Sequence, residues 1–192
     1  MIRDSILKAL HHHAKVVGAM ESVIENIETA VVEITDTLQR GNKLLLAGNG
    51  GSAADAQHWA AEWMIRLSHD LQRPGLAAIA LTTDTSILTA GANDIGFENV
   101  FARQIEALAQ QGDLVILIST SGNSGNLLKA AETAREKGAK TLGILGNRGG
   151  KMNDVCDFHV IVPSDDTQRI QEMHSLVGHL LCELSERALF QK

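Results

Sequence analysis

The chain has 192 residues with a formal net charge of −6, 44% hydrophobic residues and 3% aromatic residues. This composition is typical of a single folded domain, and the negative charge with few aromatic rings argues against direct nucleic-acid binding, which needs basic surface and stacking platforms. No apolar run is as long as a membrane span, and the two cysteines, Cys156 and Cys182, form no CxxC pair, so we expect a cytoplasmic protein in a reducing compartment.

Residues 1–41 are predicted to form a helical N-terminal segment that packs on the rest of the domain or on a neighbouring subunit. Apolar residues recur at helical spacing from Ile2 to about Arg40, and Gly18 is a candidate break between two helices. The run His11-His12-His13 lies within this segment. Consecutive residues point about 100° apart around a helix, so these side chains cannot converge on one metal ion, and we expect exposed or packing histidines.

After Lys43, short apolar runs alternate with longer helical patterns. The apolar runs predict five strands, over residues 44–47, 76–81, 114–118, 141–145 and 158–162. The helical patterns predict helices over residues 52–67, 84–92, 98–108, 125–137 and 167–189. Strict alternation predicts an α/β fold with a doubly wound five-stranded parallel sheet between two layers of helices, formed as a single domain by residues 1–192. In such sheets, ligands bind beyond the carboxyl ends of the strands.

The first predicted strand leads into a glycine-rich turn, Gly48-Asn49-Gly50-Gly51-Ser52. Backbone N–H groups of such a turn can approach an anion at the N-terminus of the next helix. The spacing Gly48-x-Gly50-x-x-Ala53 also satisfies a loose dinucleotide-binding pattern. That pattern requires an acidic residue about 20 positions further on, whereas the second strand ends about 30 residues later, at Thr82-Thr83-Asp84. The turn alone is therefore ambiguous.

The helix after this turn carries Asp55, His58, Glu62 and Arg66 at spacings of three and four, so we expect these residues on one face. His58 and Glu62, four residues apart, are suited to bind one divalent metal ion or to form a proton-transfer pair that faces a substrate. A solvated face with an ion pair is the alternative interpretation.

The third predicted strand ends in Ser119-Thr120-Ser121-Gly122-Asn123-Ser124 and then enters a helix. Three serine hydroxyls, one threonine hydroxyl and a helix N-terminus, which carries roughly half a positive charge, predict a binding site for one phosphate dianion. The alternative is ordinary turn chemistry, with Asn123 or Ser124 as the helix N-cap. The density of hydroxyl groups favours the phosphate site.

The last predicted helix carries four polar residues inside an otherwise apolar pattern, namely Gln171, Glu172, His174 and His179. Spacing alone favours a pair formed by Gln171 and His174, which lie one turn apart. A single histidine in such a pattern is more often a packed core residue than a ligand.

Four motifs follow one another along the chain. They are Gly48-Asn49-Gly50-Gly51-Ser52, Ala92-Asn93-Asp94-x-Gly96-Phe97, Ser119-Thr120-Ser121-Gly122-Asn123-Ser124 and Arg169-Ile170-Gln171-Glu172. In this order they resemble the sugar isomerase (SIS) domains and, within that group, the phosphoheptose isomerases over essentially the whole chain. The resemblance implies an SIS-type, Rossmann-like sandwich. It also implies an aldose–ketose isomerase that converts sedoheptulose 7-phosphate into D-glycero-D-manno-heptose 7-phosphate through an enediolate, the first step of activated heptose synthesis for lipopolysaccharide.

The resemblance further implies a set of site residues. It implies Zn²⁺ bound by His58, Glu62, Gln171 and His179, with Glu62 and His179 catalytic and His174 a supporting or packing residue. It implies substrate contacts from Asn49, Gly50, Gly51, Ser52, Glu62, Asn93, Asp94, Ser119, Thr120, Ser121, Ser124 and Gln171. Because a metal-bound carboxylate is a weaker base, the role of Glu62 as base, ligand or both stays open. Gln168 departs from the family, since some members carry an acidic residue there.

The resemblance implies a homotetramer as well. Gln171 and His179 are eight residues apart, about 12 Å along a straight helix and about 80° around it. One ion can touch both only if each side chain stretches fully, so a neighbouring subunit can supply one of them more easily. We therefore expect each site to combine the face of His58 and Glu62 with at least one group from another chain.

The alternative function is a non-catalytic SIS-domain phosphosugar-binding protein, such as the DnaA initiator-associating proteins. These share sequences like Ala53-Ala54-x-Ala56-Gln57-His58 and Arg169-Ile170-Gln171-Glu172-Met173-His174. They resemble the isomerases without the full catalytic set, whereas Glu62 and His179 are both present here. This favours the enzyme, with a phosphorylated seven-carbon sugar as partner and no direct contact with nucleic acid or membrane.

Overall fold

Five parallel strands form the central sheet of the computed structural model, which describes residues 1–191. The strands are β1 (Leu44–Gly48), β2 (Ala78–Ala80), β3 (Leu114–Ser119), β4 (Lys140–Leu145) and β5 (Phe158–Ile161), in the order β2-β1-β3-β4-β5. Every residue of β1 and β3 is buried, as expected for a parallel sheet covered on both faces. The strand order reverses between β1 and β3, which makes their carboxyl ends the expected place for a ligand.

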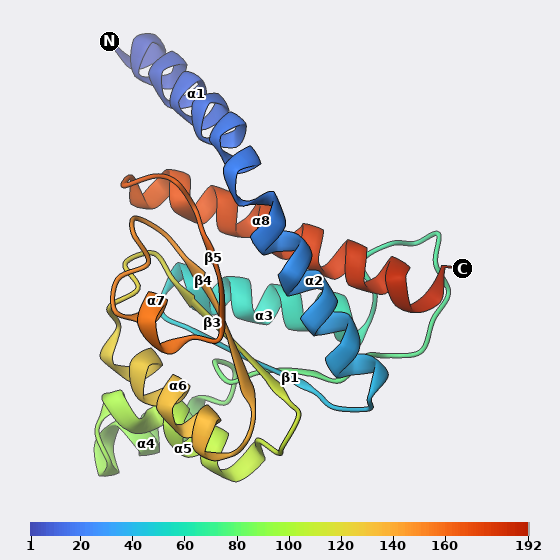
Figure 1. Cartoon of the computed structure of the whole chain (residues 1–192). Helices are drawn as coiled ribbons and strands as arrows, with labels where there is room; N and C mark the ends of the chain where they lie inside the picture. Colours follow the sequence, from blue (N-terminus) through green and yellow to red (C-terminus); the bar gives the residue numbers. More distant parts are fainter. Residues whose placement is uncertain (192) are drawn as a thin grey trace.

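Helices cover both faces of the sheet (Figure 1). They are α1 (Ile2–Ala19), α2 (Ile24–Gln39), α3 (Gly51–Met64), α4 (Thr85–Asp94), α5 (Val100–Leu108), α6 (Gly125–Glu136), α7 (Met152–Val155) and α8 (Thr167–Phe190), with short 3₁₀ turns η1 (Met20–Val23) and η2 (Phe97–Asn99). One buried cluster joins α2, α3 and α8 to Leu44 and Leu46 of β1. The other joins α5 and α6 to Leu45 and Ala47. Alternate residues of one strand thus feed two cores, and the predicted doubly wound architecture is confirmed.

Close packing of α3 on α8 depends on Gly178. A Cβ at this position would overlap the indole ring of Trp59, which is fully buried. The missing side chain lets the two helices approach, and the Trp63 indole N–H then donates to the Ser185 hydroxyl across the contact at 3.0 Å. This contact fixes the helix that carries His58 and Glu62 against the helix that carries His179.

The predicted break between two helices at Gly18 is confirmed to within one residue, because α1 runs to Ala19 and the tighter turn η1, which keeps Met20 and Val23 buried, separates it from α2. Beyond shifts of one or two residues, the elements differ from the prediction at three places. The predicted helix 52–67 ends at Met64. The predicted strand 76–81 is reduced to β2, because the Leu76 amide donates to the Trp63 carbonyl of α3 instead of pairing in the sheet. The short helix α7 was not predicted.

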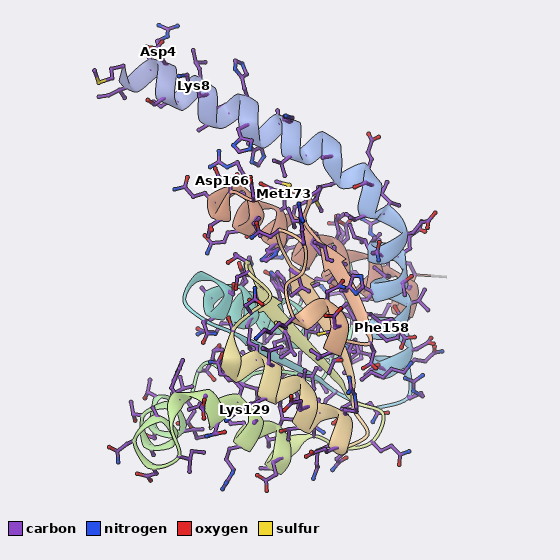
Figure 2. All side chains as sticks on the ribbon, turned by 60° about the vertical axis from the view of Figure 1, so that its left-hand side comes forward. Asp4, Lys8, Lys129, Phe158, Asp166 and Met173 are labelled. Atoms are coloured by element: carbon purple, nitrogen blue, oxygen red, sulfur yellow. The ribbon has the colours of Figure 1, made fainter. Side chains whose placement is uncertain are left out.

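Helix α1 extends beyond the sheet layers, and Figures 1 and 2 show its first turns, with Asp4 and Lys8, as a projecting arm. The exposed fractions of Ile2, Ile6 and Leu10 are 80%, 54% and 59%. No helix within residues 1–191 has the length and apolar character needed to cross a membrane.

The histidine run of α1 meets the start of α8. His11 is exposed, His13 Nδ1 lies 2.7 Å from a Glu172 oxygen, and His12 Nδ1 lies 3.6 Å from Asp166. The three rings have separate surroundings, as the helical geometry predicted.

Candidate active site

A small cavity of about 100 Å³ opens at the carboxyl ends of β1 and β3. It is lined by Asn49, Ser52, Ile118, Ser119, Thr120, Ser121 and Ser124. The structure therefore brings the two predicted anion-binding turns together at the point where the strand order reverses. We call this cavity, with these lining residues, the hydroxyl cup.

The hydroxyl groups of the cup are held in place by the loop itself. Ser119 Oγ accepts a hydrogen bond from the Gly122 amide at 3.1 Å and lies 3.3 Å from Ser124 Oγ. Ser121 Oγ accepts from the Asn123 amide at 3.2 Å. Ser124 occupies the N-cap position of α6, but its side chain makes no capping hydrogen bond. Helix capping therefore does not account for this hydroxyl, which faces Ser119 instead.

Two supports of the cup were missed by sequence reasoning. Gly122 has φ +64°, and a Cβ there would overlap the Gly149 carbonyl oxygen, so the loop rests directly on the turn after β4. Asn49 and Asn126 exchange two amide hydrogen bonds of 3.0 and 2.9 Å, which tie the β1–α3 turn to the first turn of α6. Two features of the sequence could have indicated these supports. They are the consecutive glycines Gly149-Gly150 and the polar residue Asn126 in the first turn of a predicted helix.

A second cluster lies where α3 meets α8. His58 Nε2 is 3.1 Å from a Glu62 carboxylate oxygen, and the His58 and His179 rings meet edge to face with centroids 5.0 Å apart. One donor atom from each of the three residues lies within 4.8 Å of the others. Two imidazoles and a carboxylate at this separation form a set that can bind one divalent metal ion. We call His58, Glu62 and His179 the triad.

His174 lies apart from the triad. Its side chain is fully buried, Nε2 is 3.1 Å from the Leu145 carbonyl oxygen, and burial lowers its pKa to about 4, so the ring is neutral at physiological pH. The pair of Gln171 and His174 that spacing favoured does not form a site, because α8 turns His174 toward the sheet. His174 is a packing residue.

Gln171 lies at the start of α3 rather than at the triad. A Cβ built on Gly51 would lie 2.8 Å from Gln171 Nε2, and a cavity of about 390 Å³ beside them is also lined by Asp55, Arg169 and Ser175. Ser175 Oγ donates to Asp55 at 3.4 Å, and burial raises the pKa of the Asp55 carboxyl group. From Gly51 to His58 is about 10 Å along the helix axis.

Three further predicted positions lie outside both clusters. Asn93 and Asp94 are exposed at the end of α4, where the Asn93 amide donates to Asp94 at 2.7 Å, and they line neither cavity. Figure 1 shows α4 beside α5, on the side of the sheet opposite α3 and α8. Arg66 does not continue the predicted stripe, because α3 ends at Met64 and the chain turns away.

Comparisons with known proteins agree with this architecture. The sequence model of the SIS domain family matches residues 10–146. A phosphoheptose isomerase from Aliarcobacter butzleri is 51% identical over 98% of this chain and 99% of its own length, and one from Helicobacter pylori is 52% identical over 100% of both. Solved phosphoheptose isomerase structures from Neisseria gonorrhoeae and Francisella tularensis superpose with TM-scores of 0.90 and 0.93, at 38% and 32% identity. They cover 96% and 97% of this chain, and 98% and 99% of their own chains.

Proposed function

This chain belongs to the SIS domain family and, within it, to the phosphoheptose isomerases, and from that premise we propose that it interconverts sedoheptulose 7-phosphate and D-glycero-D-manno-heptose 7-phosphate. The observation that supports this reaction most directly is the convergence of His58, Glu62 and His179 from α3 and α8. The alternative, a binding protein without catalysis, is less favoured because such SIS-domain proteins resemble the isomerases without the full catalytic set, whereas Glu62 and His179 are both present here. The two free cysteines, Cys156 and Cys182, and the phosphorylated substrate favour a cytoplasmic location.

The proposed chemistry is a proton transfer between neighbouring carbons. Glu62 takes the proton from C1 of the ketose and returns it to C2, while His179 moves the hydroxyl proton from the C1 oxygen to the C2 oxygen. The enediolate that forms between these steps carries negative charge on oxygen. The hydroxyl cup holds the phosphate through Ser119, Thr120, Ser121 and Ser124, with the turn of Asn49 to Ser52 on its other side. This fixes the sugar while the protons move.

The donor set of the triad fits Zn²⁺, because two imidazole nitrogens and one carboxylate oxygen are typical ligands of catalytic zinc. We assign His58, Glu62 and His179 of one chain to this ion, with Gln171 as a fourth ligand. When bound, the ion would supply positive charge near the developing oxyanion. Because coordination would weaken a carboxylate as a base, Glu62 would serve as ligand and as base at different steps or would have only one of these roles.

Removal of the metal is expected to abolish activity reversibly. Dialysis against a chelator should lower turnover of sedoheptulose 7-phosphate, and a divalent ion should restore it, with Zn²⁺ favoured by the nitrogen and carboxylate donors. The check is a turnover assay combined with elemental analysis of the active protein. Active preparations that contain no metal would exclude the zinc assignment and leave the acid–base pair of Glu62 and His179.

Loss of one cup hydroxyl is expected to weaken phosphate binding. Ser121→Ala should reduce the affinity for sugar phosphates and for inorganic phosphate by about 1 to 3 kcal/mol, the contribution of one hydrogen bond to a charged group. Calorimetric titration measures both ligands. The control is Ser22→Ala, because Ser22 donates to the Ala19 carbonyl on the distant N-terminal segment. Equal affinities of the wild type, Ser121→Ala and Ser22→Ala would indicate that the loop is an ordinary turn and not a phosphate site.

We also propose a homotetramer with shared sites, in which the first turns of α1 pack on a neighbouring chain while α2 packs in the core of its own domain. Ile2, Ile6 and Leu10 of α1 are exposed, and the His58 side chain is 47% exposed, which leaves the triad open to water. Ser52 in the cup and Glu62 are ten residues apart, about 15 Å along α3. An extended sugar spans only about 10 Å from its phosphorus to C1, by the reach of a chain of eight bonds. The cup and the triad of one chain are therefore too far apart to hold one sugar, and a neighbouring chain can supply one of the two.

A further inference from the structure

The end of α3 next to Glu62 is held by a side chain from a later loop. Helix α3 ends at Met64, so the carbonyl groups of its last turn lack partners within the helix. The guanidinium of Arg73, in the loop between α3 and β2, donates to the Glu62 carbonyl and to the Trp63 carbonyl, each at 2.8 Å. Arg73 therefore caps the turn of helix from which the Glu62 carboxylate projects.

The same guanidinium reaches α8. Arg73 Nη2 lies 3.2 Å from a Glu186 carboxylate oxygen, and the two side chains are 0% and 2% exposed. Glu186 follows His179 by seven residues, two turns of α8, so both lie on the same side of that helix, about 10 Å apart along its axis. One buried ion pair thus connects the backbone of Glu62 to the stripe of α8 that carries His179.

Stability alone does not explain this ion pair. Removing two charges from water is costly, and Arg73 Nε and Glu186 Oε1 have no hydrogen-bond partner within residues 1–191. Replacement of a buried ion pair by apolar residues of similar volume is often neutral or stabilising. The packing of Gly178 on Trp59 and the hydrogen bond from Trp63 to Ser185 already join the two helices. What Arg73 adds is a fixed position for the backbone of Glu62.

We propose that Arg73 is a positioning residue, which uses its ion pair with Glu186 to fix Glu62 relative to His179. The guanidinium fork is essential to this role, because it bonds two carbonyl groups of α3, the Pro74 carbonyl and one carboxylate at once. The inference rests on the proposed function, since it concerns the geometry of the same triad. It predicts that Arg73 affects metal binding and turnover but leaves the distant hydroxyl cup unchanged.

The test compares Arg73→Lys with Arg187→Lys. Lysine keeps the charge beside Glu186 but has a single ammonium group, which cannot reproduce the fork. For Arg73→Lys we expect the Zn²⁺ affinity of the metal-free protein, measured against a chromophoric chelator, to fall about 10- to 100-fold, the usual effect of removing a group that orients a metal ligand. We expect kcat to fall similarly, with KM and the affinity for inorganic phosphate unchanged. Arg187 pairs with Glu183 on the surface, so its variant should match the wild type.

A second variant separates position from stability. Arg73→Met combined with Glu186→Leu removes both buried charges, and we expect a melting temperature at or above that of the wild type, together with the same losses of Zn²⁺ affinity and kcat. A folded variant of either kind with wild-type Zn²⁺ affinity and kcat would overturn the proposal. Failure of both variants to fold would make Arg73 a structural residue and would overturn it too.

Glu62→Gln, assayed in parallel, separates this inference from the proposed function. Full activity in Glu62→Gln would refute the function assigned to the triad, whatever Arg73 does. Loss of activity in Glu62→Gln together with full activity and Zn²⁺ affinity in Arg73→Lys would refute the positioning role alone.

Discussion

Glu62→Gln is expected to lower the turnover of sedoheptulose 7-phosphate by at least about 10²-fold while the protein stays folded. The amide is nearly isosteric with the carboxylate, and its oxygen can still face His58 Nε2, which lies 3.1 Å from the Glu62 oxygen in the structure. It cannot accept a proton from carbon at neutral pH. Steady-state kinetics give the loss in kcat, and a thermal melt shows whether the fold is retained.

The matched control is Glu183→Gln on the neighbouring helix α8. Glu183 pairs with Arg187 at the surface, with a side chain that is 41% exposed, so its variant should keep wild-type kinetics. Near-normal turnover in folded Glu62→Gln would remove Glu62 from the proton transfer.

The fold could be predicted from the sequence because its periodicities are strong. Strands β1 and β3 are continuous apolar runs buried on both faces, and each leads into a turn rich in glycine, serine or asparagine. The errors fall where long-range contacts override the local pattern. The Leu76 amide binds the Trp63 carbonyl, so the apolar run 76–81 contributes only three residues to the sheet. No local signal reports such a contact between a helix and a following loop.

The candidate site could be predicted in part. The pair of His58 and Glu62 follows from helical spacing, and the cup follows from two turns that neighbouring strands place side by side. His179 was identified by resemblance alone, because spacing within α8 favoured Gln171 with His174. Only the packing of α8 on α3 decides which histidine meets His58. No local sequence pattern indicated a role for Arg73, because its partners Glu62 and Glu186 are 11 and 113 residues away in the chain.

Two inactive variants are expected to restore activity to each other if the site is shared between chains. The structure places donor atoms of His58, Glu62 and His179 of one chain within 4.8 Å of one another, so we expect Gln171 rather than His179 to come from a neighbour. Gln171 of the same chain lies beside Gly51, about 10 Å along α3 from His58, so we assign the fourth ligand to the Gln171 of a neighbouring subunit. Glu62→Gln and Gln171→Ala would then inactivate the same centre from different chains.

The experiment unfolds the two variants together and refolds them as mixed oligomers. Random pairing places the intact triad of a Gln171→Ala chain next to the intact Gln171 of a Glu62→Gln chain in about a quarter of the centres, which should recover a corresponding share of activity. The control mixes Glu62→Gln with His179→Ala and should stay inactive, because every triad in that mixture carries one defect. Recovery in the control would place Glu62 and His179 of one centre in different chains. No recovery in the first mixture, despite proven subunit exchange, would place Gln171 in the same chain as the triad and would require α8 to bend between Gln171 and His179.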